Sequence, residues 1–135
     1  MIDIETEVFE ILQPIVLAAY PDALVVPEEV RQSVQFPAVS IVQMDNLVYP
    51  LTMDSGSIEH DAEVVFEINV YSNLLNGKKA ECKAIMTLID DKLTFMGFRR
   101  MFLNPTPNMN DATIYRMTGR YRALVSKDKT IYRRR

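Results

Sequence analysis

Residues 63–71, EVVFEINVY, carry the clearest secondary-structure signal in this chain of 135 residues. Apolar side chains occupy every second position of the stretch: Val64, Phe66, Ile68 and Val70. Because successive side chains of a strand point to opposite faces of a sheet, the alternation predicts a strand with one buried and one solvated face. The sheet is therefore expected to carry its core on one side.

The same alternation returns at residues 112–125, near the C-terminal end of the sequence. The apolar positions are Tyr115, Met117, Tyr121, Ala123 and Val125, which share a face with Gly119, and the polar positions are Arg116, Thr118, Arg120 and Arg122. We predict a second long strand here and a shorter one at residues 98–103. Residues 104–111 separate them and are rich in Pro and Asn, which favour turns.

Two segments have the spacing of amphipathic helices. Apolar residues recur three and four positions apart over residues 3–19, although Pro14 predicts a kink or an early end. Residues 78–96 predict a second helix, for which Gly97 is a suitable C-terminal cap. The expected apolar stripe of this helix is Ala80, Ala84, Ile85, Leu88, Ile89 and Leu93.

Residues 38–42 form an apolar run after Pro37 and predict a further strand. Turn residues dominate residues 43–61, which we interpret as an extended arm or a long loop. Uninterrupted loops of this length are unusual in compact domains and are often functional. The apolar residues of the arm are Leu47, Val48, Tyr49 and Leu51. The element order predicts one domain, residues 1–135, of the α+β class. We expect a mostly antiparallel sheet of about four strands, with two helices packed on one face, plus the arm.

Charge is divided unevenly along the chain. Residues 1–98 hold 16 Asp and Glu against five Lys and Arg, a net charge of −11, whereas residues 99–135 hold ten Lys and Arg against two acids, a net charge of +8. Such a division bears on association with partners or between copies. The basic residues that we assign to subunit or partner contact are Arg116, Arg120, Arg122, Lys127, Lys129, Arg133, Arg134 and Arg135.

Residues suited to catalysis are sparse. One metal site can be imagined, from Glu59, His60, Asp61 and Glu63, but a solvated loop that enters a strand explains these residues better. Asp90 and Asp91 would point about 100° apart on a helix, so we expect a solvated face there. Cys82 is the single cysteine and is expected to be structural. We predict a protein that is not an enzyme and uses no cofactor.

Several segments together resemble the tail terminator, or tail completion, proteins of long-tailed bacteriophages. They are residues 20–23 after the first helix, residues 37–41, residues 66–72, the Lys- and Ala-rich helix that closes at Gly97, and residues 111–123. The resemblance implies a structural virion protein that forms a hexameric ring on the tail tube, ends its polymerisation and joins the tail to the head connector. Implied partners are further copies of the chain, the tail tube protein and head-tail connector proteins. DNA would pass through the lumen without sequence-specific binding.

Two alternatives stay open from the sequence. Neck and head-completion proteins of the same particles share part of the pattern, and the basic C-terminal strand could instead belong to an intracellular nucleic-acid-binding module. A pI of about 5.2 favours assembly over nucleic-acid binding. The acidic N-terminal residues do not resemble a signal peptide, so we expect synthesis in the host cytoplasm, no membrane partner and a place in the tail or neck of the virion.

Overall fold

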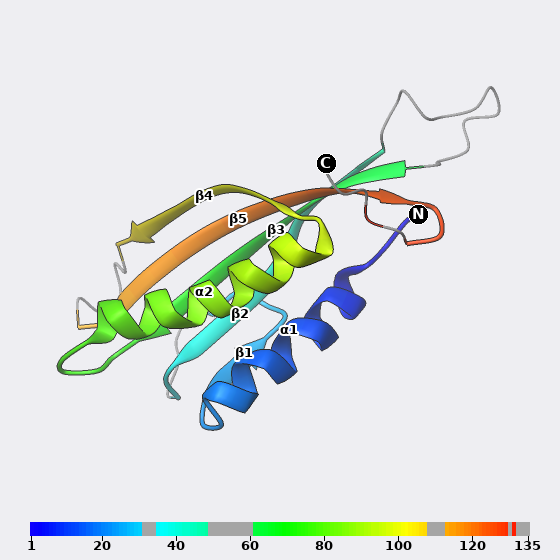
Figure 1. Ribbon diagram of the computed structural model, residues 1–135. Helices are drawn as coiled ribbons and strands as arrows, with labels where there is room; N and C mark the ends of the chain where they lie inside the picture. Colours follow the sequence, from blue (N-terminus) through cyan, green and yellow to red (C-terminus); the bar gives the residue numbers. More distant parts are fainter. Residues whose placement is uncertain (31–34, 49–60, 108–112, 130, 132–135) are drawn as a thin grey trace, which may run out of the picture.

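The computed structural model places two helices over a five-stranded sheet (Figure 1). It describes residues 1–30, 35–48, 61–107, 113–129 and 131. The elements are α1 (Glu5–Ala19), β1 (Leu24–Val26), β2 (Ala38–Val48), β3 (Asp61–Ser72), α2 (Lys78–Met96), β4 (Arg99–Thr106) and β5 (Tyr115–Ser126). The strand order is β1-β2-β3-β5-β4, with β1 and β2 parallel and the other neighbours antiparallel. The predicted α+β class is confirmed.

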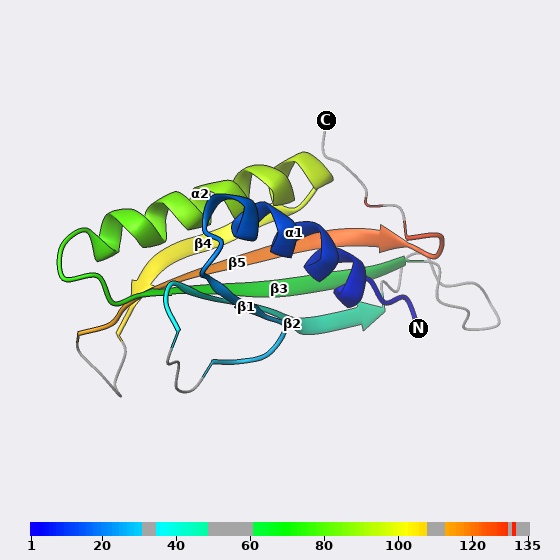
Figure 2. The same ribbon diagram turned by 90° about the horizontal axis from the view of Figure 1, so that it is seen from below.

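Both helices lie on the same side of the sheet (Figure 2). Helix α1 covers β1 and β2, while α2 packs on β3, β5 and β4, and the two helices contact each other. The sheet has five strands, one more than the predicted number of about four, because the short β1 also joins the sheet through parallel pairing with residues 38–40 of β2.

Strand β2 is longer than the predicted strand at residues 38–42. Residues 43–48, which we had assigned to the arm, continue β2 and pair with β3. Pairing with a long neighbouring strand therefore outweighs the weak strand preference of Asp45 and Asn46. Residues 49–60, the remainder of the predicted arm apart from Asp61, lie outside the described residues.

The core fills the space between the helices and the sheet. Helix α1 runs through Pro14, so the predicted early end is wrong, and it buries Val8, Leu12 and Val16. The buried side of α2 consists of Cys82, Ile85, Met86, Ile89 and Leu93. Ala80 and Ala84 are exposed, which shifts the apolar stripe from its predicted position. Gly97 caps α2 in the left-handed conformation with φ of 111°, as predicted.

Gly119 marks a close approach of α2 to the centre of β5. A Cβ at this position would lie 3.1 Å from Tyr121 Cε1 and 3.3 Å from both Leu103 Cδ1 and Met86 Sδ. These separations are shorter than ordinary van der Waals contact, so the absence of a side chain lets α2 sit close to the sheet.

A polar contact ties α2 to β5 and β4. The buried Tyr121 hydroxyl donates to Asp90 Oδ1 at 2.7 Å, and Arg100 Nη1 lies 3.2 Å from the same oxygen. Burial and then the hydrogen bond to the carboxylate raise the pKa of Tyr121, so the phenol stays protonated as a donor. Asp90 is thus a structural acceptor, which corrects its predicted place on a solvated face, whereas Asp91 is exposed.

We expect Tyr121→Phe to lower the free energy of unfolding by about 1–2 kcal/mol, because it removes a hydrogen bond to a charged acceptor while Arg100 still pairs with Asp90. Urea denaturation followed by circular dichroism measures the change. Tyr20→Phe is the matched control, since the hydroxyl of the half-buried Tyr20 has no hydrogen bond within the described residues. Equal stability of Tyr121→Phe and the unmodified protein would contradict this role.

Candidate interaction surface

The face of the sheet opposite α1 and α2, here called the helix-free face, carries charged and polar side chains from neighbouring strands. One row across the sheet is Asp45, Val65, Arg122 and Arg99, from β2 to β4, and the next row is Val42, Glu67, Arg120 and Phe102. Strand β3 contributes acids and β5 contributes bases to adjacent positions. Opposite charges therefore meet within one subunit.

A buried amide organises the centre of this face. Asn69 Oδ1 accepts hydrogen bonds from Arg116 Nε at 2.9 Å and from Thr118 Oγ1 at 2.7 Å. Asn69 Nδ2 donates to Glu67 Oε1 at 3.1 Å. Thr106 Oγ1 donates in turn to the Thr118 hydroxyl at 2.6 Å. Side chains of β3, β5 and β4 are thereby joined in one network, which satisfies the buried Asn69 and Thr118 and fixes the three strands relative to one another.

The arginines of β5 have partners in their own subunit. Arg120 Nη2 lies 2.5 Å from Glu67 Oε2, and Arg122 Nη1 lies 3.7 Å from Glu63 Oε1. Arg116 is held by the amide network described above. The assignment of these arginines to subunit or partner contact stays a prediction. Intramolecular pairing balances part of the charge that the sequence suggested would be available to a neighbour.

The residues that follow β1 cross to the helix-free face. There the Tyr71 hydroxyl lies 3.5 Å from the Val30 carbonyl oxygen to which it donates, and the Arg116 guanidinium lies 5.5 Å from the centroid of the Tyr71 ring. Burial raises the pKa of Tyr71. One end of the helix-free face is thus covered by the chain itself.

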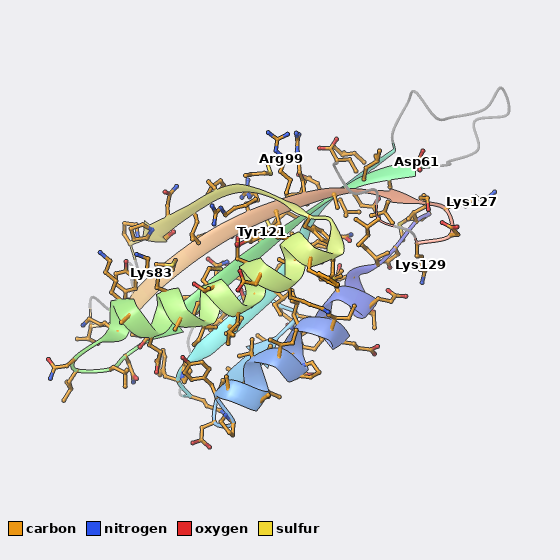
Figure 3. All side chains as sticks on the ribbon, viewed as in Figure 1. Asp61, Lys83, Arg99, Tyr121, Lys127 and Lys129 are labelled. Carbon is orange, nitrogen blue, oxygen red and sulfur yellow. The ribbon has the colours of Figure 1, made fainter. Side chains whose placement is uncertain are left out.

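Lys127 and Lys129, which follow β5, lie at one end of the sheet (Figure 3). Lys129 forms an ion pair with Glu7 of α1, and this hydrogen bond lowers the pKa of Glu7 and raises that of Lys129. Lys127 is exposed. Ile131 forms a β-bridge with Val125 and packs partly buried against the core. The remaining predicted contact residues, Arg133, Arg134 and Arg135, lie outside the described residues.

Of the four apolar residues assigned to the arm, two lie in β2 and two lie outside the described residues. Leu47 belongs to β2, is 55% exposed and lies beside Glu63 on the helix-free face. Val48 is the last residue of β2. Tyr49 and Leu51 lie outside the described residues, so their place in an arm stays a prediction.

The residues of the imagined metal site do not all fall within the described part. Glu59 and His60 lie outside it, Asp61 is buried at the start of β3, and Glu63 faces Arg122. Among the described residues, no group of three or more His, Cys, Asp or Glu side chains is placed to hold a metal ion.

Cys82 is fully buried on α2. Its Sγ lies 3.5 Å from the Val70 carbonyl oxygen and 3.6 Å from the Tyr115 carbonyl oxygen, the two acceptors between which the single S–H is shared. Burial raises the pKa of Cys82 to about 12, with a further contribution from Glu81. A thiol with so high a pKa stays protonated, in agreement with the structural role expected from the sequence.

A scan against protein-family models finds no match, and a search of curated proteins finds no significant relative. Within the described residues, no helix is both long and apolar enough to cross a membrane. Sequence reasoning missed the pairing of Glu63 and Glu67 with the β5 arginines. The signal that could have revealed this pairing is the alternation that residues 63–71 and 112–125 share. Placing the two predicted strands side by side would have brought the acids and the arginines together.

Acid titration tests the pairing of Glu67 with Arg120. Burial opposes ionisation of Glu67, but hydrogen bonds from Arg120 and Asn69 lower its pKa on balance. Because the folded-state pKa is lowered, the stabilisation is present above the unfolded-state value and is lost as pH falls through the folded-state value. We expect Glu67→Gln to be less stable than the unmodified protein at neutral pH and to lose less stability on acidification.

Thermal denaturation between about pH 7 and pH 2 measures both differences. Glu10→Gln, an exposed substitution on α1, is the control and should follow the unmodified protein. If Glu67→Gln lost stability on acidification as steeply as the unmodified protein, the carboxylate would not contribute as described.

Ile131 is expected to contribute to the stability of the fold. We expect Ile131→Ala to lower the free energy of unfolding by about 1–2 kcal/mol, less than for a fully buried isoleucine, because the side chain is only partly buried. Lys127→Ala, an exposed substitution nearby, should change it by less than about 0.5 kcal/mol. Guanidinium denaturation compares the two variants. An unchanged midpoint for Ile131→Ala would mean that the β-bridge to Val125 contributes little.

Proposed function

We propose that this chain is a structural virion protein that forms a hexameric ring, caps the tail tube of a long-tailed bacteriophage, ends its polymerisation and joins the tail to the head connector. The single observation that carries the proposal is the resemblance of sequence pattern to tail terminator proteins, which covers nearly the whole chain. An α+β subunit with two helices on one sheet face is compatible with it.

The architecture supports such a role in physical terms. A ring of identical subunits requires a contact between two different surfaces of the subunit, repeated around an axis. The subunit offers different surfaces at the two edges of its sheet, where β1 and β2 lie at one edge and β4 at the other. The cross-strand network around Asn69 ties β3, β5 and β4 together, which suits a subunit that must hold one geometry under load.

Other copies of the chain, the tail tube protein and the head-tail connector proteins are the proposed partners, with DNA passing through the lumen. A neck or head-completion protein of the same particle is the alternative that shares the sequence pattern. The nucleic-acid-binding alternative loses support, because Glu67 and Glu63 partly neutralise the arginines that would track a phosphate backbone.

Deleting the gene from a phage that carries it separates these roles. We expect tail tubes of uncontrolled length and heads without tails, because nothing ends tube polymerisation or presents a joining surface. Electron microscopy of lysates measures tube length and joining, and a plasmid copy of the gene is the control that should restore both. Tubes of normal length that fail to join heads would point to a neck protein, and normal joined particles would contradict both roles.

A further inference from the structure

The sheet has two edges, and each edge is blocked against further strand pairing at one end. At the first edge β1 pairs with residues 38–40 of β2, so within the described residues the edge formed by residues 41–48 has no partner strand. At the second edge, β4 pairs with β5 and with no other strand of the described residues. Unpaired backbone donors and acceptors at such edges are templates for a strand of another chain.

At both edges, the stretch that is blocked against further strand pairing lies on the same rows of the sheet. The stretches that remain free to pair also share rows. The row of Val39, which β1 covers at the first edge, continues through Val70 and Met117 to Pro105 on β4. Proline has no backbone N–H and cannot donate to a further strand. Residues 41–45 and residues 99–103 are therefore the stretches that lie in shared rows and are both open to pairing.

Charge on these open stretches is complementary. Asp45 and Arg99 occupy the same row at opposite edges, and both side chains are exposed on the helix-free face. Neither has an ion-pair partner within the described residues. Figure 3 shows Arg99 pointing away from α2. At the two edges, one charge of each sign thus has no ion-pair partner among the described residues.

The neighbouring row adds an apolar match. Val42 lies at the first edge and Phe102 at the second, both half-buried. Side by side, these two side chains would form a cross-strand pair of a β-branched and an aromatic residue, a combination that stabilises sheets.

Both open stretches also contain a β-bulge at nearly the same level. The register shifts between Gln43 and Asp45 on β2 and between Arg100 and Phe102 on β4, which leaves Met44 and Met101 as the extra residues. Met44 is 46% exposed and Met101 is 50% exposed. Bulges bend a strand and increase its twist, so both edges are expected to bend at corresponding places.

We infer that residues 99–103 of one copy pair edge to edge with residues 41–45 of the next copy, with Arg99 facing Asp45. The inference rests on the proposed ring. Rotation about an axis roughly along the strands preserves strand direction, and β2 and β4 are antiparallel within the subunit. The new pairing is therefore antiparallel, and the sheet continues from one subunit to the next.

Disulfide cross-linking tests the contact. Opposed residues of an antiparallel pair have Cα atoms about 4.5–5.5 Å apart, within the range that a disulfide bridges. A mixture of Asp45→Cys and Arg99→Cys proteins should give covalent dimers on mild oxidation, whereas neither protein alone should. The double variant should give a ladder of bands that ends at the number of copies in the ring. Asp45→Cys mixed with Lys83→Cys, an exposed position on α2, is the control that should give no covalent dimers.

Charge exchange tests the same pair without cross-linking. Asp45→Arg and Arg99→Asp should each weaken assembly at least about fivefold, as judged by the protein concentration at half assembly, and the double exchange should restore it. Lys83→Glu is the matched control and should leave assembly unchanged.

Light scattering of each oxidised sample, at the same concentration and with tail tubes added, distinguishes a failure of the edge contact from a failure of the proposed ring. Rings without cross-links between positions 45 and 99 would overturn the edge contact and leave the ring intact. Cross-links between two copies of Asp45→Cys alone would indicate a two-fold contact and would also overturn it. A protein that stays monomeric under all conditions would contradict the ring itself.

Discussion

The antiparallel register of β3 and β5 is the constraint on which the remaining structure depends. The two central strands pair residue by residue from Asp61 opposite Ser126 to Ser72 opposite Tyr115. This register turns Phe66 and Tyr121 into the core beneath the helices and Glu67 and Arg120 toward the helix-free face. Because side chains alternate along a strand, a slip of one residue would exchange the two sets and bury the charges. The contacts of the helices with the sheet and the positions of the two sheet edges depend on this register.

Pairing of β3 with β5 also brings together acidic and basic residues that lie in different parts of the sequence. Along the sequence, the acids of residues 1–98 and the bases of residues 99–135 look like surfaces for two different molecules. In space, Glu63 and Glu67 lie beside Arg122 and Arg120, so part of the opposite charge is matched within the subunit. Arg99, which has no ion-pair partner within the described residues, lies at the edge of the sheet. The contact that we propose between copies is thereby more specific than attraction between an acidic and a basic half.

Much of the fold could be predicted from periodicity alone. The strands around residues 63–71 and 112–125 and the helix at 78–96 have strong patterns, because each buries one continuous face. Strand β1 was missed, since three residues carry no period, and the extension of β2 was missed because Asp45 and Asn46 are poor strand formers that a long partner strand nevertheless accommodates. The role of Asp90 depends on Tyr121, a residue 31 positions away. No local pattern shows such a contact, and the same holds for the alignment of the two sheet edges.

Electron cryomicroscopy of tail tubes assembled with the purified protein tests the central claim most directly, because it gives position, copy number and subunit geometry together. The account predicts one additional hexameric ring at the head-proximal end of each tube, with the sheet continuing from subunit to subunit around it. Protein distributed along the tube, protein at the opposite end, or subunits joined through their helices would contradict it.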